Sequence, residues 1–89
     1  MQRYKIIFKG RVQGVGFRYR ALRIANSLNL LGSVKNLYDG SVEVILQGKK
    51  LAINTFIKRI KEERFIRVED INCFELDLDN TLDSFEILY

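Results

Sequence analysis

Apolar residues follow two different periods along the chain, and the changes between these periods mark the expected elements. Tyr4, Ile6 and Phe8 alternate with their neighbours, which is the two-residue period of a strand with one buried face. Between Phe17 and Leu28 the apolar residues recur at helical spacing and form one stripe. Further along, the same two periods predict a strand over 33–37, a strand over 42–47, a helix marked by Ile53, Phe56, Ile57 and Ile60, a strand over 68–78, and a short strand over 85–89.

Glycines and one Asp-Gly pair separate these elements. Three glycines lie between residues 10 and 16, where we expect them to end the first strand. Asp39-Gly40 is typical of a hairpin turn, because both central turn positions tolerate a positive φ. Within 68–78 the alternation changes phase near Asp70, which indicates a β-bulge.

The resulting order is strand–helix–strand–strand–helix–strand, followed by a short terminal strand. This order predicts an α+β ferredoxin-like sandwich, in which two helices cover one face of a mixed, mainly antiparallel sheet. We expect a single domain over residues 1–89. The alternation places on the opposite, solvated face Lys5, Ile7, Lys9, Glu43, Ile45 and Gln47.

Composition excludes several classes of protein. One cysteine rules out an internal disulfide framework and a four-thiolate zinc site, and the lack of histidine rules out Ser-His and Cys-His nucleophiles. No apolar run approaches the ~20 residues of a membrane span, and the charged start lacks a signal-peptide core. We therefore expect a cytoplasmic protein, with which one unpaired cysteine is compatible.

Charge is distributed unevenly along the chain. Residues 1–38 carry eight Lys or Arg and no Asp or Glu, whereas residues 39–89 carry seven against eleven. Such asymmetry suggests an anionic partner for the first segment. Composition alone is equally compatible with folding that mixes the two halves and averages the field.

The junction at residues 10–18 is the most informative segment for chemistry. N–H groups at a helix N-terminus lack partners within the helix and, with the helix dipole, favour an anion such as phosphate. Arg18 lies in the first turn of the expected helix, where the dipole disfavours a cation by up to ~1 kcal/mol. An anion between this guanidinium and the loop amides explains that position. A tight turn with Arg18 facing solvent explains the same residues, so both interpretations stay open here.

Other chemical motifs do not fit the sequence. Gly48-Lys49-Lys50 lacks the upstream glycine and the Ser/Thr of a Walker loop. Cys73 has acidic neighbours and no arginine close after it, so we expect a core or strand residue and not a nucleophile. The carboxylates of 75–83 are spread along a strand and loop, unlike a magnesium site.

Three segments carry a resemblance to a known family. Residues 10–18, GRVQGVGFR, resemble the acylphosphatase signature G-x-V-Q-G-V-x-F-R. Residues 32–43, GSVKNLYDGSVE, are similar to that family's G-x-V-x-N-x-x-D-G-x-V-E, and the ending FEILY resembles its closing F-x-I-x-Y strand. The resemblance reaches both ends of the chain and implies the same ferredoxin-like fold.

The resemblance also implies a reaction, which is metal-independent hydrolysis of small acyl phosphates to a carboxylate and inorganic phosphate, without a cofactor. By position, Arg18 would hold the phosphoryl oxygens and Asn36 would orient the attacking water. From the residues alone, Asn36 is better explained as a polar residue that closes a strand. The implied phosphate-binding loop consists of Gln13, Gly14, Val15, Gly16, Phe17 and Arg18. The implied partners are small acyl phosphates and inorganic phosphate, with no nucleic acid or membrane, and we expect a monomer.

One segment departs from the family pattern. Family members usually carry a Gly-Pro-rich turn after the second helix, whereas this chain has EERFI at 62–66 and no proline. This departure falls at the end of that helix and the start of the next strand. Basic residues over 49–67 are interrupted by Glu62 and Glu63, so we interpret them as a solvated helix face.

Two rival functions share the expected fold. RNA-binding RRM domains are the first, but the segment 13–17 fails the RNP1 pattern at its basic and aromatic positions and follows the first strand instead of lying on the third. The second is a regulatory or carrier domain that binds phosphorylated ligands without catalysis. Fold alone does not separate these functions.

Overall fold

The computed structural model describes residues 1–89, all of the chain. Its elements alternate as the periodicity predicts, with two helices among five strands. In chain order they are β1 (Gln2–Arg11), α1 (Phe17–Ser27), β2 (Leu31–Asn36), β3 (Val42–Gly48), α2 (Lys50–Lys61), β4 (Arg67–Leu76) and β5 (Phe85–Ile87).

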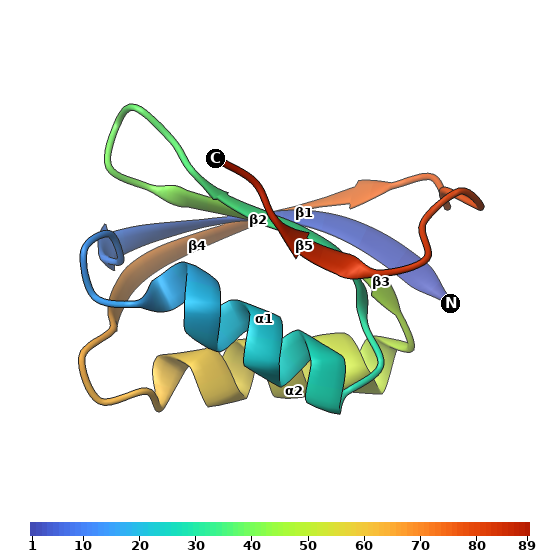
Figure 1. Cartoon of the computed structure of the whole chain (residues 1–89), viewed down its shortest axis with the longest axis horizontal. Helices are drawn as coiled ribbons and strands as arrows, with labels where there is room; N and C mark the ends of the chain where they lie inside the picture. Colours follow the sequence, from blue (N-terminus) through green and yellow to red (C-terminus); the bar gives the residue numbers. More distant parts are fainter.

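The strands form one mixed sheet in the order β4-β1-β3-β2-β5. All neighbouring pairs are antiparallel except β2 and β5, which run parallel. Both helices lie on the same face of the sheet (Figure 1). The predicted α+β ferredoxin-like sandwich is therefore confirmed.

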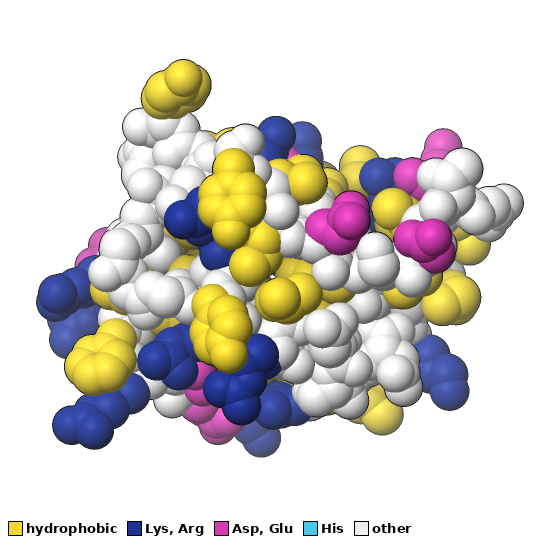
Figure 2. Space-filling view, in the orientation of Figure 1, with side chains coloured by type: hydrophobic (Ala, Val, Ile, Leu, Met, Phe, Trp, Pro, Cys, Tyr) yellow, Lys and Arg dark blue, Asp and Glu magenta, His cyan; other side chains and the backbone are white.

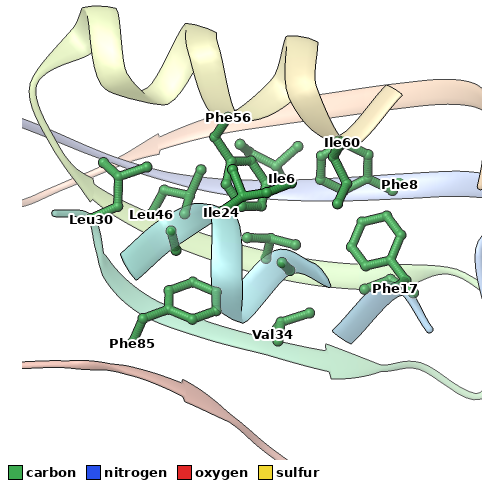
Figure 3. Close-up of a cluster of buried hydrophobic side chains, with 14 of the residues drawn as sticks. Ile6, Phe8, Phe17, Ile24, Leu30, Val34, Leu46, Phe56, Ile60 and Phe85 are labelled. Carbon is green, nitrogen blue, oxygen red and sulfur yellow. The ribbon is translucent and has the colours of Figure 1, made fainter. Parts of the chain in front are cut away.

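The core fills the space between the helices and the inner face of the sheet (Figure 3). Helix α1 buries Phe17, Ala21, Ile24 and Ala25, and helix α2 buries Ile53, Phe56 and Ile60. From the sheet, Ile6 and Phe8 of β1 are fully buried against them. The ring of Phe17 lies 5.2 Å from the ring of Phe8, so the first residue of α1 is anchored directly on β1.

The first strand continues further than its glycines predict. Gly10 does not end β1, which runs to Arg11 because a register shift between Lys9 and Gly10 absorbs the irregularity. On the facing strand this shift falls at residues 68–70, where the phase change near Asp70 predicted a bulge. The expectation that Gly10 stops the strand was wrong, whereas the bulge is confirmed.

The segment after α2 forms a compact turn without proline. Successive turns are closed by the N–H of Glu63 donating to Ile60 and the N–H of Ile66 donating to Glu63. The side chain of Ile66 is buried and joins the core. Helix α2 can therefore end at Lys61 and β4 begin at Arg67.

Gln47 is buried although its expected face is solvated, whereas Cys73 is a strand residue as predicted. Gln47 belongs to the outer face by alternation, yet only 6% of it is exposed. Its amide exchanges two hydrogen bonds with the backbone of Asp79, because the segment between β4 and β5 crosses this end of the sheet. Cys73 lies on β4 as a strand residue but is exposed, since β4 is an edge strand and the helices do not cover it there.

Neither α1 nor α2 combines the length and apolar character that crossing a membrane requires.

The packing predicts a large difference between two phenylalanines. Phe56 is fully buried, whereas half of Phe74 on β4 is exposed. Phe56→Ala should lower the free energy of unfolding by about 3–5 kcal/mol, because it leaves a cavity in the core. Phe74→Ala should cost less than about 1 kcal/mol. Urea denaturation measures both, and equal losses would contradict this description of the core.

Candidate active site

Residues 12–16 join β1 to α1 and form the predicted glycine loop. Gly14 and Gly16 have φ angles of 73° and 79°, which glycine adopts without the strain that other residues incur. Gly16 is the N-cap of α1, so no side chain caps the helix, and its first turn contains no acidic residue. The first N–H groups of α1 therefore lack a side-chain acceptor and remain available to an external anion.

One cavity of about 260 Å³ opens beside this loop. Arg18 from α1 and Asn36 from the end of β2 both line it, together with Gly14, Gly16 and Phe17. The structure thus brings together Arg18 and Asn36, the two predicted catalytic residues, although they come from different elements. Neither side chain forms a hydrogen bond or ion pair within the chain.

Arg18 stacks on the last residue of the chain. Its guanidinium carbon lies 5.1 Å from the centre of the Tyr89 ring, within the range of a cation–π contact. This contact restrains the arginine while leaving its N–H donors unused by the protein. Figure 2 shows most of the Lys and Arg side chains on the left and lower left, the side that carries the start of α1, the end of α2 and the turn after it, whereas acidic side chains gather over the segment before β5.

The side chain of Gln13 links the glycine loop to the β2–β3 hairpin. Its side-chain amide donates to the carbonyl of Leu37 at 2.8 Å and to that of Ser41 at 2.9 Å. Neither Gln13 nor Val15 lines the cavity. Because both acceptors lie in the hairpin that follows Asn36, this amide ties the loop carrying Arg18 to the strand carrying Asn36.

Asp39 stabilises the same hairpin from within. Its carboxylate accepts hydrogen bonds from the hydroxyl and the N–H of Ser41. These two donors hold the pKa of Asp39 below its usual value of 3.8. Ser41 in turn provides one of the carbonyls that accept from Gln13, so the turn and the loop form one connected network.

The sequence did not identify four other residues of the cavity wall. Val12, Tyr19, Ile87 and Tyr89 also line it. The ending FEILY was noticed only as a strand, but the parallel pairing of β5 with β2 brings the end of the chain beside Asn36. No three His, Cys, Asp or Glu side chains gather into a group suited to a metal ion.

The fold and the cavity define the class of protein: a ferredoxin-like α+β sandwich whose glycine loop, arginine and asparagine face one small cavity. The acylphosphatase family model matches residues 4–87. A *Clostridium acetobutylicum* acylphosphatase is 41% identical over 90 residues, which cover 100% of this chain and 99% of that protein.

Solved structures agree with this match. The crystal structure of the *Bacillus subtilis* acylphosphatase superposes with a TM-score of 0.92 at 40% identity, and all of both chains is covered. An acylphosphatase from *Coxiella burnetii* gives a TM-score of 0.89 at 28% identity, covering 98% of this chain and 92% of that one. The chain belongs to the acylphosphatase family, and the family and enzyme class expected from its sequence are confirmed.

Loss of the Gln13 amide should loosen the site. Gln13→Ala removes two hydrogen bonds, so we expect the free energy of unfolding to fall by about 1–2 kcal/mol. Asn54→Ala, an exposed amide on α2, should change it by less than about 0.5 kcal/mol. Urea denaturation measures both variants, and an unchanged stability of Gln13→Ala would contradict the proposed tie between loop and hairpin.

The lowered pKa of Asp39 predicts a pH-dependent contribution to stability. A carboxyl with a depressed native pKa stabilises the fold above its unfolded value of 3.8, and this contribution is lost as the pH falls through the native pKa. Asp39→Asn should therefore be less stable than the parent chain at about pH 7, and the difference should shrink at about pH 2.5. Chemical denaturation at both pH values tests this, and a difference independent of pH would argue against it.

Proposed function

We propose that the chain hydrolyses small acyl phosphates at the cavity between the glycine loop and the end of β2. In this proposal the N–H groups of residues 13–18 and the guanidinium of Arg18 bind the phosphoryl oxygens. Asn36 orients the attacking water. The observation that carries the proposal is the convergence of Arg18 and Asn36 on the one cavity that Gly14 and Gly16 also line.

Arg18 is suited to bind a phosphoryl group because no acid of the chain neutralises it. The two ion pairs of the structure are Arg20–Glu63 and Lys35–Glu43. A guanidinium presents paired N–H donors that match two phosphoryl oxygens, and such charge-assisted bonds are about twice as strong as neutral ones. Since the helix start disfavours a cation, a phosphoryl anion between Arg18 and the loop amides relieves this conflict.

Asn36 is suited to position water because its amide has both a donor and an acceptor. It is the last residue of β2 and pairs with Val42 of β3, so its backbone is fixed by the sheet. Its side chain is free of bonds within the chain and faces the cavity that holds Arg18. The amide can accept a hydrogen from water while it donates to a phosphoryl oxygen.

The reaction needs little more than this positioning. Water attacks phosphorus, the bond from phosphorus to the acyl oxygen breaks, and its electron pair leaves on the carboxylate. A carboxylate has a pKa of about 4, so it departs without a general acid. The proton lost by water passes to solvent or to the phosphate product. Positioning and charge stabilisation then account for most of the catalysis, and a chain without histidine can perform it.

We also propose that the chain acts as a cytoplasmic monomer on small-molecule substrates, with inorganic phosphate as product. A single unpaired cysteine is compatible with a reducing compartment. The outer face of β1 and β3 carries Lys5, Ile7, Glu43 and Ile45 and no aromatic side chain. Stacking of RNA bases, which RRM domains require on these strands, is therefore not favoured.

The test is hydrolysis of acetyl phosphate in the presence of a chelator. Arg18→Ala should lower kcat/KM by roughly 10²–10³-fold, because it removes the charged donor to the transition state. Asn36→Ala should lower kcat to a similar extent and change KM less, because its main role is to orient the attacking water, whereas Arg18 supplies the charge that binds the phosphoryl group. Inorganic phosphate should compete with substrate in the parent chain.

Matched variants make this test specific. Arg59→Ala and Asn54→Ala remove the same side-chain types from α2, which contributes no residue to the cavity. Both should keep the parent activity. A parent chain that is inactive, or equal activity in Arg18→Ala and Arg59→Ala, would reject the proposed catalytic site.

A further inference from the structure

A second, larger cavity lies where the end of β1, the turn after α2 and the start of β4 meet. Its volume is about 750 Å³, compared with about 260 Å³ for the candidate active site, and the two share no lining residue. The β1–α1 loop and the α2–β4 turn lie at the same end of the molecule (Figure 1). The wall consists of Arg11, Lys61, Arg64, Phe65, Ile66, Arg67, Val68 and Glu69.

Four cations face this cavity and none is neutralised within the chain. Arg11, Lys61, Arg64 and Arg67 take part in neither of the two ion pairs of the structure. Glu69, the one acid in the wall, forms no ion pair with them. The basic residues of 49–67 were interpreted as a solvated face, and Lys61, Arg64 and Arg67 among them are exposed. These three also line the cavity together with Arg11 of β1.

The β-bulge is what places two of these arginines opposite each other. Lys9 pairs with Asp70, but Gly10 pairs with Val68, so Glu69 is the extra residue and Arg11 pairs with Arg67. Without the shift, Arg11 would face Val68. Gly10 has a φ of 127°, and a Cβ there would lie 2.3 Å from the carbonyl oxygen of Arg67, so the close approach of the two strands requires glycine.

Like charges directly opposite in an antiparallel pair destabilise the sheet. Arg11 and Arg67 form such a destabilising like-charge pair at the wall of the cavity. Lys61 and Arg64 add two further positive charges to the same wall. A bound anion that bridges the two guanidinium groups converts the repulsion into charge-assisted hydrogen bonds. We propose that this cavity binds a small ligand that carries at least two phosphate groups.

The arrangement favours a small ligand over a nucleic acid. The cations converge on one cavity from three elements, whereas a nucleic-acid backbone is followed by a groove or stripe of positive charge. Phe65 is the one aromatic residue in the wall of this cavity, and the guanidinium of Arg64 already lies 5.4 Å from its ring centre. That ring face is therefore unavailable to stack on a base.

Isothermal titration calorimetry with tripolyphosphate tests the proposal. The parent chain should bind it, and the double variant Arg11→Gln/Arg67→Gln should bind at least about tenfold more weakly, because it loses both bridging donors. Arg18→Ala should change the affinity by less than about threefold, which separates this cavity from the candidate active site. The control Lys49→Gln/Lys58→Gln removes two exposed cations elsewhere on α2 and its cap and should behave like the parent chain.

Thermal unfolding provides a second readout that also reports on folding. Tripolyphosphate should raise the Tm of the parent chain and of Arg18→Ala, but not that of Arg11→Gln/Arg67→Gln. Without ligand, the double variant should melt at or above the parent Tm, because the like-charge pair is gone. If it does not fold, Arg64→Gln alone should weaken binding, since it removes a cation of the wall without touching the strand pair.

Several results would overturn the proposal. These are no binding to the parent chain, an equal loss in the control double variant, or binding that disappears in Arg18→Ala alone. The proposal would also be overturned if single-stranded RNA or a polyglutamate peptide binds the parent chain and tripolyphosphate does not, since this result would favour a macromolecular partner.

Discussion

The candidate site depends on one side-chain amide that bridges two elements distant in sequence. Gln13 donates to the carbonyls of Leu37 and Ser41, so the loop before α1 cannot move independently of the β2–β3 hairpin. A water-orienting group and a phosphate-binding group must keep their relative positions to within a fraction of an ångström for efficient transfer. The sheet holds Asn36 in place, and the core holds Phe17, the neighbour of Arg18. The Gln13 amide links the loop before Phe17 to the hairpin after Asn36.

The remaining side of the cavity is built by topology. Because β5 runs parallel to β2, the chain ends beside the carboxyl end of the strand that carries Asn36. Tyr89 can then stack against Arg18 without using the N–H donors that a phosphoryl group needs. An acidic residue in that place would have held Arg18 equally well, but it would also have neutralised the charge on which anion binding depends.

The period of the apolar residues was sufficient to predict the sandwich, because each helix and each inner strand buries one regular face. Ile24 of α1 and Phe56 of α2, for example, are both buried against the sheet. The period failed where the outcome depends on a partner far away in sequence. Gly10 looks like a strand end until the register of β4 is known, and Gln47 looks solvated until the segment around Asp79 covers it.

The candidate site shows the same limit of sequence patterns. The motif identified Gln13 as a loop residue but not its hydrogen bonds to the hairpin. The contact of Tyr89 with Arg18 is likewise a tertiary feature that no local pattern encodes. The catalytic roles of Arg18 and Asn36 stay predictions.

The uneven distribution of charge along the sequence corresponds to two separate cavities in the structure. The acid-free segment 1–38 contributes Arg18 to the small cavity and Arg11 to the large one, and buried Val12 separates these two surroundings along the chain. One guanidinium with backbone N–H groups suits a single phosphoryl group, and a cavity of about 260 Å³ accommodates this group together with a small acyl group. Four side-chain cations around about 750 Å³ suit a larger and more highly charged anion. The volume and the number of cations together therefore assign different ligands to the two cavities, to each of which the acid-free segment contributes one arginine.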